Sequence, residues 1–122
     1  MTEQSPRETH IERPFRGKMR RFYLGIPQMQ EVEKLTGFGI GEIAMRLSTH
    51  RYGSEEIYQT IRLALEGGGT STVEATALLI PCQAEPVADF TALATEIVAA
   101  RLYGVAPAGE DDAPEAPASE AA

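Results

Sequence analysis

The sequence lacks tryptophan and has a single cysteine, Cys82. One cysteine excludes an intramolecular disulfide, and it leaves a structural zinc site without the further thiolates that such sites usually need. No base follows Cys82 closely, so we interpret its thiol as structural. The two histidines, His10 and His50, come with neither a nucleophile nor a set of metal ligands. We therefore expect no enzymatic activity, no metal and no cofactor.

Long hydrophobic runs are also missing. A membrane helix needs about 20 consecutive apolar residues, and no stretch of this chain approaches that length. The first residues, Met-Thr-Glu-Gln-Ser-Pro, contain no apolar segment of the kind found in a secretory signal peptide. The expected location is the cytoplasm.

Charge is distributed unevenly along the chain, whose net charge is −7. Residues 1–23 hold six basic and three acidic side chains, whereas residues 104–122 hold five acids and no base. Polar residues 1–9 are predicted to be a disordered leader, and residues 106–122, rich in Ala, Pro and Glu, a disordered acidic tail. The interval 10–105 is then one domain, because its length suits a single small core.

Hydrophobic spacing indicates a mainly α (α+β) fold, in which an N-terminal β-hairpin precedes a compact bundle of four to five short helices. The hairpin is predicted from His10–Phe15 and Lys18–Leu24, which flank a turn at Arg16-Gly17 where glycine can adopt positive φ. Phe22 and Leu24 are expected to point inward and Arg21 and Tyr23 outward.

The clearest helix begins at Ser54, the expected N-cap, and ends at the glycines 67–69. Its apolar positions recur at the helical period. They are Ile57, Ile61, Ala64 and Leu65.

The same spacing predicts helices on either side of this one. A helix opening at Pro27 should bury Gln28, Met29, Val32 and Leu35, and the next should bury Ile40, Ile43, Ala44 and Leu47. A capping box at Ser71–Glu74 should start a helix that buries Val73, Ala77 and Ile80 and ends before Pro81. The last helix is expected over residues 87–102, with Val87, Phe90, Leu93, Ala94 and Ile97 buried.

Glycine-rich segments at 37–41 and 67–71 lack the spacing and the lysine of nucleotide-binding loops, and turn and cap chemistry explains them. The hairpin mixes bases with aromatics, which is also typical of single-strand nucleic-acid binders. A partner-contact surface is predicted from exposed basic and aromatic side chains. Its members are Arg16, Lys18, Arg21, Tyr23, Arg51 and Tyr52.

Several segments, in order, match a known pattern. They are Phe15-Arg-Gly17, Arg21-Phe-Tyr-Leu-Gly-Ile-Pro27, residues 31–37 (EVEKLTG), Gly41-Glu-Ile-Ala44 and residues 61–71 (IRLALEGGGTS). Together they resemble the gene transfer agent family of small tail proteins, encoded in phage-like clusters of alphaproteobacteria. The resemblance covers roughly residues 15–105. The family is described either as tail tube related or as a tail assembly chaperone.

The resemblance implies a non-enzymatic role in building a phage-like tail, in a gene transfer agent or a prophage. One reading is a tail assembly chaperone that binds the tape-measure protein and helps tube subunits polymerise, and that could form a homo-oligomer. A second is a structural, tube-associated component of the particle. A third, a small nucleic-acid-binding regulator, rests on the basic hairpin alone. Because a tube subunit should be mainly β, the predicted helices favour the chaperone.

Overall fold

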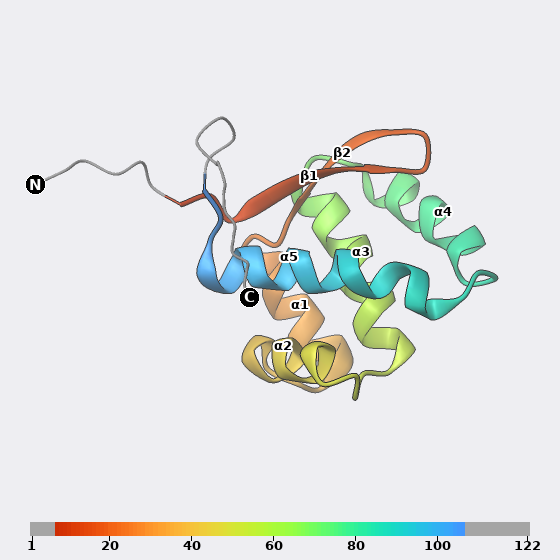
Figure 1. Ribbon diagram of the computed structural model, residues 1–122. Helices are drawn as coiled ribbons and strands as arrows, with labels where there is room; N and C mark the ends of the chain where they lie inside the picture. The colour runs from red at the N-terminus through yellow and green to blue at the C-terminus, as the bar shows by residue number, and fades with distance from the viewer. Residues whose placement is uncertain (1–6, 107–122) are drawn as a thin grey trace, which may run out of the picture.

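The computed structural model describes residues 7–106, in which a β-hairpin lies across a bundle of helices (Figure 1). The elements, in order, are β1 (His10–Phe15), β2 (Lys18–Tyr23), α1 (Ile26–Thr36), α2 (Ile40–Ser48), α3 (Ser54–Gly67), α4 (Thr72–Cys82), a 3-10 helix η1 (Val87–Phe90) and α5 (Thr91–Tyr103). This arrangement confirms the predicted fold class. The predicted acidic tail lies outside the described residues, apart from Ala106.

The hairpin has the expected two-residue turn. Arg16 and Gly17 both have positive φ, 50° and 92°, and the strands pair antiparallel with Phe15 opposite Lys18. Two positive φ values match the twist of the strands, which is why such turns close short hairpins. Phe15 and Phe22 point into the core, where their rings meet edge to face with centroids 5.7 Å apart.

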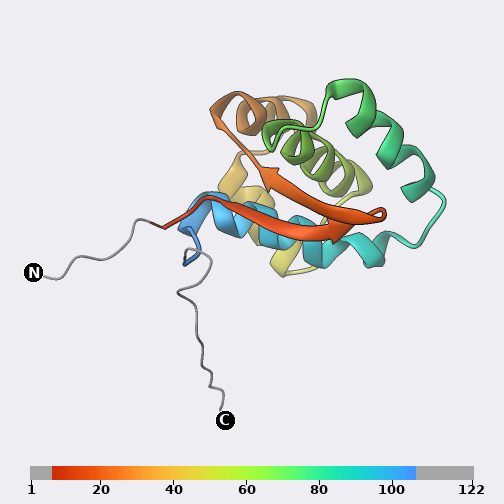
Figure 2. The ribbon, with the colours of Figure 1, turned by 90° about the horizontal axis from the view of Figure 1, so that it is seen from above.

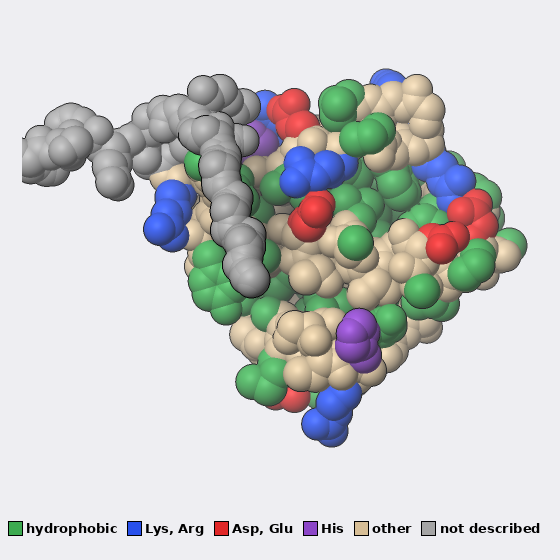
Figure 3. All heavy atoms as spheres, in the orientation of Figure 1, with side chains coloured by type: hydrophobic (Ala, Val, Ile, Leu, Met, Phe, Trp, Pro, Cys, Tyr) green, Lys and Arg blue, Asp and Glu red, His purple; other side chains and the backbone are tan. Residues whose placement is uncertain are grey.

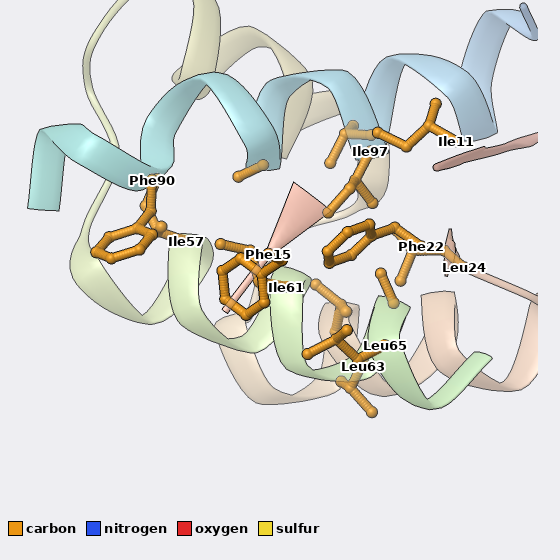
Figure 4. Close-up of a cluster of buried hydrophobic side chains, with 14 of the residues drawn as sticks. Ile11, Phe15, Phe22, Leu24, Ile57, Ile61, Leu63, Leu65, Phe90 and Ile97 are labelled. Carbon is orange, nitrogen blue, oxygen red and sulfur yellow. The ribbon is translucent and has the colours of Figure 1, made fainter. Parts of the chain in front are cut away.

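Helix α3 is the centre of the core, as its sequence predicted. It packs against α1, β2, α4 and α5, and Ile57, Ile61 and Leu65 are completely buried. Figure 4 shows these side chains in one cluster with Phe15 and Phe22 from the hairpin, Leu24 just after β2 and Ile97 from α5. The hairpin is therefore part of the core, which explains how two strands alone can be stable.

The end of α3 approaches the outer edge of β2 very closely. A Cβ placed on Gly67 would lie 1.9 Å from the carbonyl oxygen of Tyr23, and one on Gly68 would lie 2.1 Å from that of Arg21. These glycines thus do more than end a helix, because a side chain at either would collide with the backbone of β2.

The two ends of the described chain are joined by backbone hydrogen bonds. The N–H of Glu8 donates to the carbonyl of Val105 at 2.9 Å, and the N–H of Val105 donates back at 2.8 Å. Figure 2 shows the first strand and the end of α5 side by side at this place. Residues 7–9, assigned to the leader from sequence, are thus held against the domain at Glu8.

Helix α4 differs from its prediction in the face that it buries. Ala75, Leu79 and Cys82 are buried, whereas the predicted stripe of Val73, Ala77 and Ile80 faces solvent. Both stripes follow helical spacing, so the pattern alone could not distinguish them. The helix also continues to Cys82 instead of ending before proline: the missing N–H of Pro81 forfeits a single helical hydrogen bond, and Cys82 is the last residue of α4, so no longer helix is interrupted.

Three smaller predictions were also wrong. The N-cap of α3 is Gly53, and the carboxylate of Glu56 caps the helix by accepting from the Gly53 N–H, so Ser54 is already helical. Leu35 is exposed because the side of α1 that faces the core runs through Met29, Val32 and Thr36, and Leu35 lies beside it. The final helix begins as the 3-10 turn η1, and its α-helical part starts at Thr91. The Ser71 cap is confirmed, since its Oγ accepts from the N–H of Glu74 at 3.1 Å.

Candidate protein-binding groove

Helices α2 and α5 pack against each other and leave an apolar groove along their contact. The groove consists of two adjoining hollows of about 360 and 620 Å³, which share Leu47, Ser48 and Thr95. Gly41, at the start of α2, lies near Tyr103, at the end of α5, so the helices run antiparallel along it. We call this feature the α2–α5 groove.

Small side chains line both walls of the α2–α5 groove. On α2 they are Gly41, Ala44 and Ser48, and on α5 they are Ala92, Thr95 and Ala99. Residues at these spacings share one side of a helix. Because the walls are shallow, another helix could approach closely and place larger apolar side chains between them.

Larger side chains mark the two ends of the groove. Met45 and Tyr103 border one end, and both are largely exposed. His50 and Tyr52 border the other, where the hydroxyl of Thr91 lies 3.1 Å from that of Tyr52. In Figure 3 the face over α2 and α5 is mostly hydrophobic or uncharged, with charged groups toward its borders.

A buried ion pair fixes the connection that leads to Tyr52. The carboxylate of Glu56, 3% exposed, accepts hydrogen bonds from the guanidinium of Arg46 and from the N–H of Gly53. The same guanidinium lies over the ring of Phe38, 4.1 Å from its centroid. A buried carboxylate with these partners holds the end of α2 to the start of α3. One end of the groove is therefore rigidly placed.

The structure spreads the six predicted partner-contact residues over three places. Arg16 and Lys18 lie at the hairpin turn, Arg21 and Tyr23 toward the other end of β2, and Arg51 and Tyr52 between α2 and α3. Of the six, Tyr52 lines the α2–α5 groove. The proposed contact role of these residues remains a prediction.

Most cations of the hairpin are paired with carboxylates. The guanidinium of Arg16 donates hydrogen bonds to the carboxylate of Glu85 at 2.8 Å and to the Sγ of Cys82 at 2.9 Å. Both hydrogen bonds raise the pKa of Arg16, and the bond to Cys82 has the larger effect. Three further pairs are Arg13–Glu96, Arg20–Glu74 and Arg21–Glu12. Such pairing weakens the case for a nucleic-acid site, which needs cations free to contact phosphates.

Sequence reasoning missed the α2–α5 groove. The sequence nevertheless contains a signal for the wall on the α5 side, which is a series of small residues at helical spacing followed by an aromatic residue. These residues are Ala88 on η1 and Ala92, Thr95, Ala99 and Tyr103 on α5. The same helix also carries the buried stripe of Ala94 and Ile97, which is the stronger hydrophobic signal in its sequence.

Within residues 7–106, no three His, Cys, Asp or Glu side chains gather in a way that could hold a metal ion. Among the helices of this part of the chain, none is both long enough and apolar enough to cross a membrane. Protein contact is the chemistry that the α2–α5 groove supports.

Comparison with known proteins gives one family. A family model described as phage tail tube protein, GTA-gp10, matches residues 8–104, which include the hairpin and all the helices. Searches of curated proteins and of solved structures give no match. The match extends over most of the chain and agrees with the resemblance found in its sequence. The chain belongs to the GTA-gp10 family of phage tail tube proteins of gene transfer agents.

Proposed function

We propose that this protein is a tail assembly chaperone, which binds the tape-measure protein in the cytoplasm of the producing cell before the tail is complete. The α2–α5 groove is the observation that carries this proposal. It is apolar, its walls are built from small residues, and it is open to solvent. An exposed apolar groove between two helices suits an amphipathic helix, which would bury its own apolar stripe there.

The size of the groove also suits a helical client. At 1.5 Å per residue, the 9 residues of α2 and the 13 of α5 span about 13 and 20 Å. A client helix of three to four turns would cover that length and present side chains at i, i+3, i+4 and i+7. Tape-measure proteins are long and helical, as the family resemblance implies, and would offer such segments in number.

The fold supports a chaperone over a wall subunit of the tube. Between residues 7 and 106 the sheet consists of β1 and β2 alone, and the outer edge of β2 is covered by the end of α3. A tube wall built from sheets needs subunits with more strands and with edges free to join. Because the family is described as a tail tube protein, a second candidate function is that of a structural component attached to the tube.

Two experiments separate these functions. Deletion of the gene should abolish normal tails, and mass spectrometry of purified particles should find the protein absent or at trace level. Normal tails in the deletion strain would contradict both functions. Stoichiometric protein in the particles would contradict the chaperone and favour the structural component.

A further inference from the structure

We infer that the α2–α5 groove selects a client helix whose apolar stripe is flanked by basic residues. The inference rests on the proposed function, because it names the chemistry of the client at the same groove. It comes from the carboxylates along the borders of the groove. They are Glu42 on α2, Asp89 on η1 and Glu96 on α5.

Glu42 stands on the α2 border. It precedes Met45, which lines the groove, by three residues, and residues three apart are neighbours on one side of a helix. Its side chain is exposed, and no ion pair joins it to the rest of residues 7–106. A cation on a helix seated in the groove could therefore approach Glu42 without displacing a partner.

Asp89 and Glu96 stand on the opposite border. Asp89 is exposed, precedes the groove residue Ala92 by three residues and so lies on the same side of the chain, and has no ion pair within the described chain. Glu96 lines the groove and forms an ion pair with Arg13, whose Nε lies 2.9 Å from the Glu96 carboxylate. The two unpaired carboxylates thus lie on opposite borders, so a client with cations on both sides of its stripe would meet both.

The cations near the groove do not cancel this pattern. The charge of Arg13 is offset by Glu96, and that of Arg46 is directed to Glu56. Arg51 is exposed between His50 and Tyr52 at one end of the groove and does not itself line it. The net charge of −7 adds a long-range attraction for a basic segment, which should raise its association rate at low salt.

The test uses the full-length protein and two synthetic helical peptides of about 18 residues with one apolar stripe in common, flanked by Lys in one peptide and by Gln in the other. Binding is measured by fluorescence anisotropy in about 50 mM and about 500 mM salt, because salt screens exposed charges. An exposed charge pair typically changes affinity by up to about fivefold. We expect the Lys peptide to bind about tenfold more tightly at low salt, and the difference to vanish at high salt.

Variants assign this preference to the groove. Glu42→Gln with Asp89→Asn should remove most of the preference and leave binding of the Gln peptide unchanged. The control, Glu31→Gln with Glu55→Gln, changes net charge equally at residues that do not line the groove, and should keep the preference. Met45→Ser should weaken the binding of both peptides by the same factor.

Three outcomes overturn the inference: equal binding of the two peptides, no binding of either, or a preference that survives Glu42→Gln with Asp89→Asn. Co-purification of the tape-measure protein is measured in parallel. If that protein binds while the peptides show no charge preference, the inference fails and the proposed function stands. If the peptides behave as expected and the tape-measure protein does not bind, the proposed client is wrong and the charge preference of the groove stands.

Discussion

Met45 on α2 and Tyr103 on α5 border the same hollow, and both side chains are largely exposed, at 63% and 65%. Large apolar side chains that stand together at the mouth of an apolar groove suit contact with a partner. They are also the type of residue that contributes most to binding when a partner covers it.

Met45→Ser should weaken binding of the tape-measure protein without destabilising the fold. The exposed thioether contributes little to the core, so the free energy of unfolding should change by less than about 0.5 kcal/mol. Loss of its contact with a client should cost about 1 kcal/mol or more, or at least about fivefold in affinity. Calorimetric titration and urea denaturation measure the two effects. Unchanged affinity would remove Met45 from the binding surface.

Arg16→Ala should expose the thiol of Cys82. Cys82 is completely buried, and the Arg16 guanidinium bonds its Sγ and Glu85 while lying 5.9 Å from the ring centroid of Phe90. Without these contacts the hairpin turn should separate more often from the end of α4, so a thiol reagent should label Cys82 faster. Lys18→Ala, which removes an exposed cation beside the same turn, is the control and should not change the rate. An unchanged rate in Arg16→Ala would show that the hairpin turn is held by other contacts.

The same contact makes a prediction about pH. The pKa of Arg16 is raised in the folded protein, so the charged form stabilises the fold at every pH below the unfolded-state pKa of arginine. That contribution is lost only as pH rises through the folded-state pKa, far above neutrality. The effect of Arg16→Ala on labelling should therefore be the same at about pH 7 and pH 9, once the ionisation of the thiol reaction is corrected for. A marked fall in the effect at the higher pH would contradict this sign.

Gly67→Ala should destabilise the protein by about 3 kcal/mol. Its new methyl group would lie 1.9 Å from the carbonyl oxygen of Tyr23, so either α3 or β2 would have to move. Gly41→Ala is the matched control, because nothing lies within 4 Å of that position, and alanine in a helix is favoured by about 1 kcal/mol. Opposite shifts in the urea midpoint are expected. Equal shifts would show that α3 does not approach β2 this closely.

Thr60→Val should stabilise the protein by about 1 kcal/mol. The Thr60 side chain is completely buried on α3, and its hydroxyl has no hydrogen-bond partner among the described residues. Valine has the same shape and removes an unpaired polar group from the core. Thr36→Val is the comparison. The Thr36 hydroxyl donates a hydrogen bond to the carbonyl of Val32 at 2.8 Å, so its loss should destabilise the protein. A less stable Thr60→Val protein would reveal a partner for that hydroxyl.

The parts of the fold that the sequence predicts are those determined by local signals. Gly17 marks the turn, the spacing of Ile57 and Ile61 marks α3, and Ser71 marks the start of α4. Each of these effects acts within one or two turns of chain, so a single sequence contains the whole signal.

Relationships between distant segments account for what the sequence does not predict. Two apolar stripes on α4 compete, and the choice of Leu79 over Ile80 depends on how α3 packs. Arg16 and Cys82 are 66 residues apart, and no local pattern connects them. The α2–α5 groove forms only where two helices meet. Its small residues therefore do not predict a groove until the relative position of the two helices is known.

Co-purification of the tape-measure protein with an Ala99→Trp variant tests the central claim most directly. Ala99 is half-buried on the α5 wall, and an indole there should fill the α2–α5 groove. Ala77→Trp, the same change at an exposed position of α4 outside the groove, is the control. We predict that wild type and Ala77→Trp retain the tape-measure protein and that folded Ala99→Trp loses it. Equal recovery with Ala99→Trp would contradict the assignment of the groove as the client site.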